Sequence, residues 1–151
     1  PQVFFNFRGD QLRKNFVSHL RDAFQRSKIK SFIDEDEKRG EDVNKLFVRI
    51  EESSIALAIL STRYSESAWC LDELVKMMEL KGKNKLIVIP IFYKVEPEDV
   101  GNPTHGTEFG KNFWTLAETS SGKQIKEWKE ALKSISTKAG VCSSQERPKS
   151  I

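Results

Sequence analysis

Residues 55–74 read IALAILSTRYSESAWCLDEL and join an apolar run to an amphipathic segment. The opening run, IALAIL, has the length and composition of a buried strand, and a helix is predicted to begin near Ser67. In open α/β sheets, ligands bind outside the carboxyl ends of strands, where such a connection lies. Trp69, Cys70 and Glu73 are at positions i, i+1 and i+4 of this helix, so they share one face. The pattern indicates either a site at this edge or a Trp packed on the core beside a solvated Glu, because an amphipathic helix produces both.

Length and composition point to one folded domain. The chain has 151 residues, of which 38% are apolar and 31% charged, as is typical of a globular domain with a hydrated surface. The net charge of +3 permits anionic ligands but does not by itself indicate nucleic-acid binding. No apolar run approaches the ~20 residues of a membrane span, so no membrane partner is expected. Cys70 and Cys142 lack metal-ligand spacing and give no disulfide framework. We therefore expect a reducing setting, the cytoplasm and possibly also the nucleus.

Short apolar runs alternate with amphipathic stretches along the chain. Strands are predicted at Val3–Phe7, Ile29–Ile33, Ile55–Leu60, Leu86–Tyr93 and Val141–Ser143. Helices are predicted at Arg13–Arg26, Asn44–Ser53, Ser67–Lys81, Phe109–Thr119 and Ile125–Ala139, with Gly140 as the stop signal of the last. This alternation is typical of an α/β domain, with an open parallel sheet of about five strands and helices on both faces. Pro90 lacks the N–H that a strand residue donates, so we expect a bulge or a strand end there.

Several protein classes have signatures that this sequence lacks. The loop after the first strand reads RGD and is no G-x-G-x-x-G fingerprint, and neither a P-loop nor a G-x-S-x-G elbow occurs. His19 and His105 have no metal-site spacing, so no metal and no resident cofactor are expected. A phospho-accepting receiver domain would place an Asp at the end of the third strand, where this chain has Ser61.

Three loops are predicted to meet at one end of the sheet. They follow the first strand (Arg8, Gly9), the second strand (Arg39, Gly40) and the third strand (Trp69, Cys70, Glu73). With a flavodoxin-like strand order of 2-1-3-4-5, the crevice opens between the first and third strands. Two arginines could hold a diphosphate there, and a carboxylate could stabilise the oxocarbenium-like centre of a breaking N-glycosidic bond. The acidic loop that contains Arg39 could equally be a solvated charge run.

The same residues carry a family resemblance. The stretches VFFNFRG, RKNFVSHL, SFIDEDEKRGEDV, IEESSIALAILSTRYSESAWCLDELVKMME, LIVIPIFYKVEPEDV and WKEALKSIS follow one another over almost the whole chain. Across these stretches the chain resembles a TIR domain of the plant immune-receptor type. The segments WCLDEL and PIFYKVEPEDV are the most specific to that family. The resemblance implies a flavodoxin-like fold. It also implies cleavage of NAD+ at the nicotinamide–ribose bond, to make immune signalling nucleotides, when TIR domains associate with copies of themselves or with other TIR domains.

The resemblance also assigns roles to particular residues. It implies that Glu73 is the catalytic glutamate, and that Trp69 and Cys70 are neighbouring pocket positions. It implies a mobile loop that contains Arg39 and Gly40 at the same sheet edge. Together with Arg8 and Gly9, these are the expected binding residues for NAD+, which is a substrate and not a cofactor.

Two further expectations concern helices. Ser18 and His19 match a short motif that the family uses in one self-association surface. Helix periodicity places Glu73 on the side of its helix away from Leu71 and Leu74, so its removal is expected to change stability only as surface changes do, by roughly ±0.5 kcal/mol.

At three positions the sequence departs from the family pattern. Gln11 and Leu12 replace an acid and a hydroxyl, and Glu37 stands where a leucine is common. These departures keep open a second function, a catalytically weak adaptor that acts through TIR–TIR contacts. Turnover of nucleic acid is a further family activity that no residue here decides. We expect the TIR domain to span residues 1–143, and residues 144–151 to be a polar tail, the start of a linker or of a truncated last helix.

Overall fold

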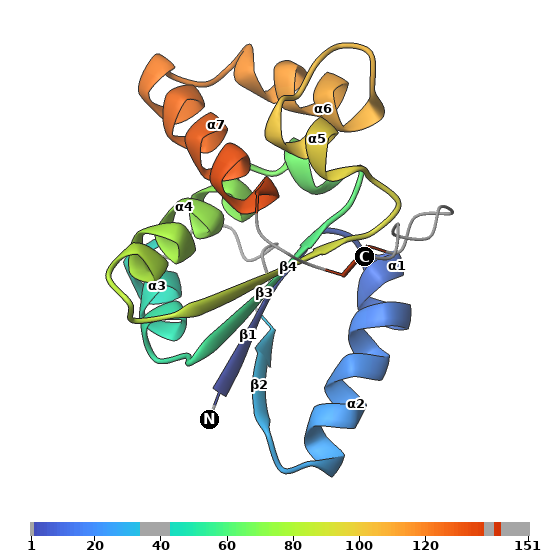
Figure 1. Cartoon of the computed structure of the whole chain (residues 1–151), viewed down its shortest axis with the longest axis vertical. Coiled ribbons are helices and arrows are strands. Elements are labelled where there is room, and N and C mark those ends of the chain that lie inside the picture. The colour runs from blue at the N-terminus through green and yellow to red at the C-terminus, as the bar shows by residue number, and fades with distance from the viewer. Residues whose placement is uncertain (1, 34–42, 138–140, 143–151) are drawn as a thin grey trace.

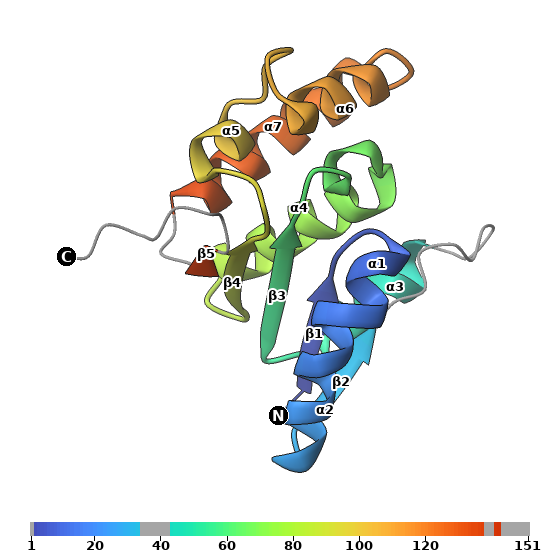
Figure 2. The same ribbon diagram turned by 90° about the vertical axis from the view of Figure 1, so that its right-hand side faces the viewer.

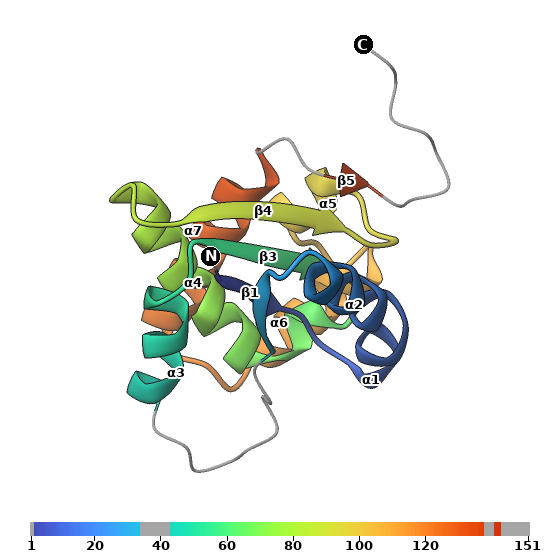
Figure 3. The ribbon, with the colours of Figure 1, turned by 90° about the horizontal axis from the view of Figure 1, so that it is seen from below.

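A five-stranded parallel sheet forms the centre of the molecule. The computed structural model describes residues 2–33, 43–137 and 141–142. The strands are β1 (Gln2–Asn6), β2 (Lys30–Ile33), β3 (Ile55–Leu60), β4 (Ile87–Phe92) and β5 (Val141–Cys142). Their order is β2-β1-β3-β4-β5, and every neighbouring pair is parallel. Figure 3 shows β4, β3, β1 and β2 side by side in this sequence. The predicted flavodoxin-like strand order is therefore confirmed.

Helices lie on both sides of the sheet (Figure 1). On one side, α1 (Asp10–Leu12) continues through a π-helical segment into α2 (Ser18–Arg26), which lies over β1 and β2 in Figure 2. The other helices are α3 (Val43–Glu51), α4 (Ala68–Gly82), α5 (Pro97–Gly101), α6 (Glu108–Ala117) and α7 (Gly122–Ser136). Of these, α3 and α4 cover the opposite side of the sheet, and α7 packs against both α4 and α5. None of the helices described has the length and apolar character that crossing a membrane requires.

The alternation of side chains along β1 divides the core into two clusters, because successive strand residues point to opposite faces. Phe4 belongs to the cluster on the α4 side, whose largest buried members include Tyr64 and Trp128. Val3 and Phe5 belong to the cluster on the α2 side. The two apolar faces explain why the central strands read as continuous apolar runs.

Pro90 does not interrupt β4, contrary to our expectation. The pairing of β4 with β3 runs without a break from Ile87, and Pro90 stands opposite Ala58. The N–H groups of Ile87 and Tyr93 donate toward β3. Because backbone donors alternate between the two edges of a strand, the nitrogen of Pro90 faces the β5 edge, where the pairing described begins only at Ile91. The missing donor therefore removes no bond from the β3–β4 ladder.

Some predictions fall outside the described residues. They are the departure Glu37 and the boundary at residue 143 with the tail 144–151, and they stay predictions. The predicted end signal Gly140 is wrong, because α7 already ends at Ser136, with Thr137 as its C-cap.

Candidate functional site

Asn6 is a buried polar residue at the carboxyl end of β1. It follows Phe4 by two positions, so its side chain points to the α4 side of the sheet. None of its surface is exposed (0%). A buried amide needs hydrogen-bond partners within the protein, and Asn6 finds them between Tyr64 and Glu73.

Ser67 sets the start of α4 and therefore the positions of the residues that follow. Its side-chain oxygen accepts a hydrogen bond from the backbone N–H of Cys70 over 3.1 Å, as an N-cap does. Cys70 and Glu73, one turn apart, are both buried, and Trp69 is half-buried against the α4-side cluster. The cap thus presents a thiol and a carboxylate to the end of β1.

Buried hydrogen bonds connect Glu73 to β1. The Nδ2 group of Asn6 donates to Glu73 Oε1 over 2.7 Å and lies 3.3 Å from the carbonyl oxygen of Cys70. The hydroxyl of Tyr64 donates to Asn6 Oδ1 and lies 3.3 Å from the same Cys70 carbonyl. The Cys70 thiol donates to the carbonyl of Phe7 over 3.2 Å. These contacts lie at the end of the sheet where open α/β folds bind ligands.

The hydroxyl of Tyr64 keeps its proton throughout the working pH range. Complete burial raises the pKa of Tyr64 well above its usual value of 10.0, and the nearby Cys70 and Glu73 raise it further, while the hydrogen bond to Asn6 acts in the opposite direction. Tyr64 is therefore a lasting donor to Asn6.

The expected surface position of Glu73 is wrong. Only 2% of Glu73 is exposed, and it belongs to the buried set of α4 together with Leu71 and Leu74. The periodicity argument assumed one buried face, whereas α4 packs against β1, α3 and α7 at once. A helix with several packed sides buries more positions than its apolar stripe indicates.

Arg8 and Gly9 follow β1 directly. Gly9 has φ +108°, a conformation that L side chains rarely adopt, and it leads the chain into α1. Arg8 Nε donates to Glu66 Oε2 over 3.2 Å, and Arg63 contacts the same oxygen at 2.8 Å. Partial burial alone would raise the pKa of Glu66, but the hydrogen bonds from Arg63 and Arg8 outweigh it and hold this pKa below its usual value of 4.5. Arg8 is thus anchored beside the end of β1 by an ionised carboxylate.

The structure brings five of the predicted site residues to one region, where the end of β1 meets the start of α4. They are Arg8, Gly9, Trp69, Cys70 and Glu73. Arg39 and Gly40 lie outside the described residues, so their place at this edge stays a prediction.

Three residues of this region escaped the sequence reasoning. Asn6 had a signal, because a polar side chain within the apolar run VFFNF needs a partner. Tyr64 and Glu66 had none, since each pairs with a residue 58 positions earlier in the chain. Such pairings depend on the tertiary arrangement and leave no local pattern.

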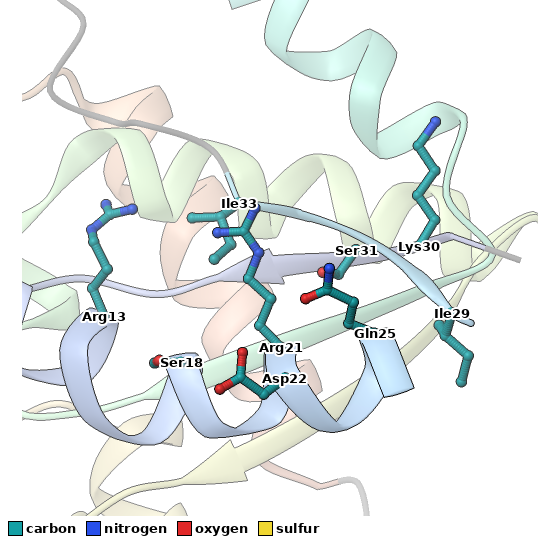
Figure 4. A pocket seen from close by; sticks show the side chains of 9 residues that line it. All are labelled: Arg13, Ser18, Arg21, Asp22, Gln25, Ile29, Lys30, Ser31 and Ile33. Atoms are coloured by element: carbon teal, nitrogen blue, oxygen red, sulfur yellow. The ribbon is translucent and has the colours of Figure 1, made fainter. Parts of the chain in front are cut away.

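The predicted self-association pair lies on α2, on the other side of the sheet. His19 is exposed, whereas Ser18 is half-buried. Ser18 lines a hollow of about 520 Å³ between α2 and β2. Figure 4 shows Arg13 and Arg21 rising from the helix on the same side as Ile33 of β2. The two members of the pair therefore offer different access to a partner. Over the described part of the chain, no three His, Cys, Asp or Glu side chains gather as a metal site would require.

Known proteins resemble this chain over most of its length. The model of the TIR domain family matches residues 2–151. Disease resistance protein RBA1 of Arabidopsis thaliana is 53% identical over 141 residues, which cover 93% of this chain and 38% of RBA1. Disease resistance-like protein CSA1 of the same plant is 51% identical over 140 residues, which cover 93% of this chain and 12% of CSA1. The chain thus spans less than half the length of both relatives.

One solved structure matches closely in fold. The TIR domains in the activated Roq1 resistosome, which directly recognises the pathogen effector XopQ, superpose with a TM-score of 0.81. Their sequence identity to this chain is 36%, and the match covers 94% of this chain and 87% of the other.

Proposed function

Because this chain belongs to the TIR domain family, we propose that it cleaves NAD+ at the nicotinamide–ribose bond, with Glu73 as the catalytic carboxylate, to make signalling nucleotides in plant immunity. The observation that supports this most is the 2.7 Å hydrogen bond from Asn6 to Glu73 at the carboxyl end of β1. This bond holds the carboxylate against Asn6, which precedes the Arg8–Gly9 turn by two residues. Ligands of open α/β sheets bind at this edge.

A carboxylate suits this reaction because of where charge develops. The nicotinamide ring of NAD+ is positively charged, so it leaves with the bonding electron pair as a neutral group and needs no acid. Positive charge then builds up on the ribose at C1′, and a nearby carboxylate stabilises it. Water adds to C1′ and releases a proton to solvent, which yields ADP-ribose and nicotinamide. Another nucleotide's hydroxyl in place of water would give a larger signalling nucleotide.

The burial of Glu73 makes self-association part of the proposal. At 2% exposure, the carboxylate meets a ribose only after the protein surface over it has opened. We assign that opening to contacts with other TIR domains, either identical copies or different members. An isolated domain would then be nearly inactive, and its specific activity would rise with protein concentration. We also propose a location in the cytoplasm, or in the nucleus, which fits the buried, reduced thiol of Cys70.

The burial of Glu73 also favours a second function, a TIR adaptor with weak catalysis. In that role the Asn6–Glu73 bond would serve the fold alone, and the protein would act only through its contacts with other TIR domains.

Consumption of NAD+ by concentrated, purified protein separates the two functions. The wild type is compared with Glu73→Gln, and with Glu79→Gln as a matched control. Glu79 lies on the same helix but is exposed and pairs with Lys76. The enzyme proposal expects turnover that rises with protein concentration, is lost in Glu73→Gln and is kept in Glu79→Gln. Equal turnover in all three proteins would reject Glu73 as the catalytic carboxylate, and no turnover in the wild type at any concentration would leave the adaptor as the function.

A further inference from the structure

We propose that Tyr64 and Asn6 are positioning residues for Glu73, and that they act as one hydrogen-bond chain from Tyr64 through Asn6 to the carboxylate. This inference rests on the proposed function, because it concerns the orientation of the same carboxylate. It adds two residues that neither the motif WCLDEL nor the neighbouring turn contains.

The hydrogen bonds of this chain all donate in one direction, from Tyr64 through Asn6 to Glu73. The amide of Asn6 turns its nitrogen toward Glu73 Oε1, which accepts a hydrogen bond, and its oxygen away from the carboxyl group. The oxygen then needs a donor, and the Tyr64 hydroxyl supplies it. If the hydroxyl were absent, the amide would lose the contact that selects this orientation, and Nδ2 could turn away from Oε1.

A third contact point fixes the chain to the helix that holds Glu73. Both Asn6 Nδ2 and Tyr64 Oη lie 3.3 Å from the carbonyl oxygen of Cys70, one turn before Glu73 on α4. Asn6 and Tyr64 are each fully buried. The hydrogen-bond chain thus fixes the position of the Glu73 carboxylate relative to β1 and to the backbone of α4.

A purely structural role makes a different prediction. If these groups only satisfy one another's hydrogen bonds, their loss lowers stability but leaves the turnover of the folded protein unchanged. If they position Glu73, their loss lowers kcat, because a misplaced catalytic group costs up to ~10²-fold in rate. The KM for NAD+ should stay the same, since neither residue belongs to the predicted substrate-binding set.

Tyr64→Phe tests the chain with the smallest change, because it removes one oxygen and keeps the ring in the core. Ser65→Ala is the matched control. Ser65 is also fully buried, and its hydroxyl donates over 2.7 Å to the carbonyl of Phe109. Both variants lose one buried hydroxyl group, but among the described contacts Ser65 touches neither Asn6 nor Glu73. Both should unfold at lower urea concentrations than the wild type.

Turnover per folded molecule is then measured at saturating NAD+. We expect kcat to fall roughly 10- to 100-fold in Tyr64→Phe with an unchanged KM, and to stay at the wild-type value in Ser65→Ala. In a Glu73→Gln background, Tyr64→Phe should cause no further loss, because coupled residues are not additive. Asn6→Ser, which is too short to bridge Tyr64 and Glu73, gives the same test if Tyr64→Phe fails to fold.

A second readout does not depend on activity. The side-chain amide protons of Asn6 should exchange slowly with solvent in NMR spectra of the wild type and of Ser65→Ala, and faster in Tyr64→Phe. If Glu73→Gln keeps wild-type turnover, the proposed function fails, while the exchange rates still test the chain. If Glu73→Gln is inactive but Tyr64→Phe has the kcat and the amide exchange of Ser65→Ala, the positioning role alone is overturned.

Discussion

Trp128 on α7 donates its Nε1–H to Asp72 Oδ1 over 2.9 Å, and Asp72 directly precedes Glu73 on α4. Burial raises the pKa of Asp72 above its usual value of 3.8; Glu127 adds to this effect, and the Trp128 hydrogen bond opposes it. A carboxyl group with a higher pKa in the folded protein binds its proton more tightly there, so its ionisation costs stability at higher pH.

Asp72→Asn should therefore raise the free energy of unfolding at pH 7. The Asn oxygen still accepts the Trp128 hydrogen bond, but the half-buried charge is gone. The gain should shrink as the pH falls toward 3.8, the usual pKa of Asp, because Asp72 itself then becomes neutral. Urea unfolding of both proteins at pH 7, 5 and 4 measures this. A gain that does not change with pH, or a loss at pH 7, would contradict the burial of the charge.

Removal of the Glu73 side chain should destabilise the protein more than a surface change does. In Glu73→Ala, the buried Nδ2 of Asn6 loses its 2.7 Å acceptor, and a buried donor without its partner costs about 1–3 kcal/mol. Glu73→Gln keeps an oxygen that can accept from Asn6, so it should lose less. Urea unfolding of the two variants measures their free energies of unfolding and so tests this order. A free energy of unfolding within 0.5 kcal/mol of the wild type for Glu73→Ala would restore the surface position that periodicity indicated.

The frame of the fold could be predicted because it follows from patterns in the sequence. The predicted strand Ile55–Leu60 coincides with β3, since a strand covered on both faces is a continuous apolar run bounded by polar residues. The regular alternation with helices predicted a parallel sheet, and the family resemblance implied the flavodoxin-like fold to which the strand order belongs. Boundaries were harder where the first turn of a helix is polar. The first helix begins at Asp10, before Arg13, because the backbone of Gly9 starts it and not an apolar periodicity.

The candidate site was predictable only in part. The motif on α4 and the turn after β1 are local in sequence, and the structure brings them together. What sequence reasoning missed depends on packing. Glu73 is buried because α4 contacts elements on several sides, and the partners Asn6 and Tyr64 come from segments far apart in the chain. A pattern confined to one helix contains neither fact.

Gly9→Ala should cost stability through the backbone alone. The φ of +108° is one that Ala rarely adopts, and an added Cβ at Gly9 would meet nothing within 4 Å. Gly9→Ala should therefore lower the free energy of unfolding by about 1–3 kcal/mol. Gly82→Ala is the control, because Gly82 ends α4 and an added Cβ there also has open space. Gly82→Ala should raise the free energy of unfolding by about 0.4–1 kcal/mol. Thermal unfolding of both variants measures the difference, and equal shifts would mean that backbone strain at position 9 has no effect.

His19→Ala should weaken self-association, because His19 is exposed on α2 and free to meet a partner. A two-fold contact uses the same patch on both molecules, so one substitution removes two contacts. At about 0.5–1.5 kcal/mol for each hydrogen bond, the association free energy should fall by roughly 1–3 kcal/mol, or about 5- to 150-fold in Kd. Ser18→Ala should have a smaller effect, since Ser18 is half-buried in the hollow beside β2.

The control for His19→Ala is Gln25→Ala. Gln25 is also polar and exposed on α2, but it lies roughly 120° around the helix axis from His19. Sedimentation velocity over a concentration series, with NAD+ turnover measured on the same samples, compares the three proteins. We expect association and turnover to fall together in His19→Ala and to match the wild type in Gln25→Ala. If both variants associate as the wild type does, this face of α2 is a solvated surface, and the contacts between domains lie elsewhere.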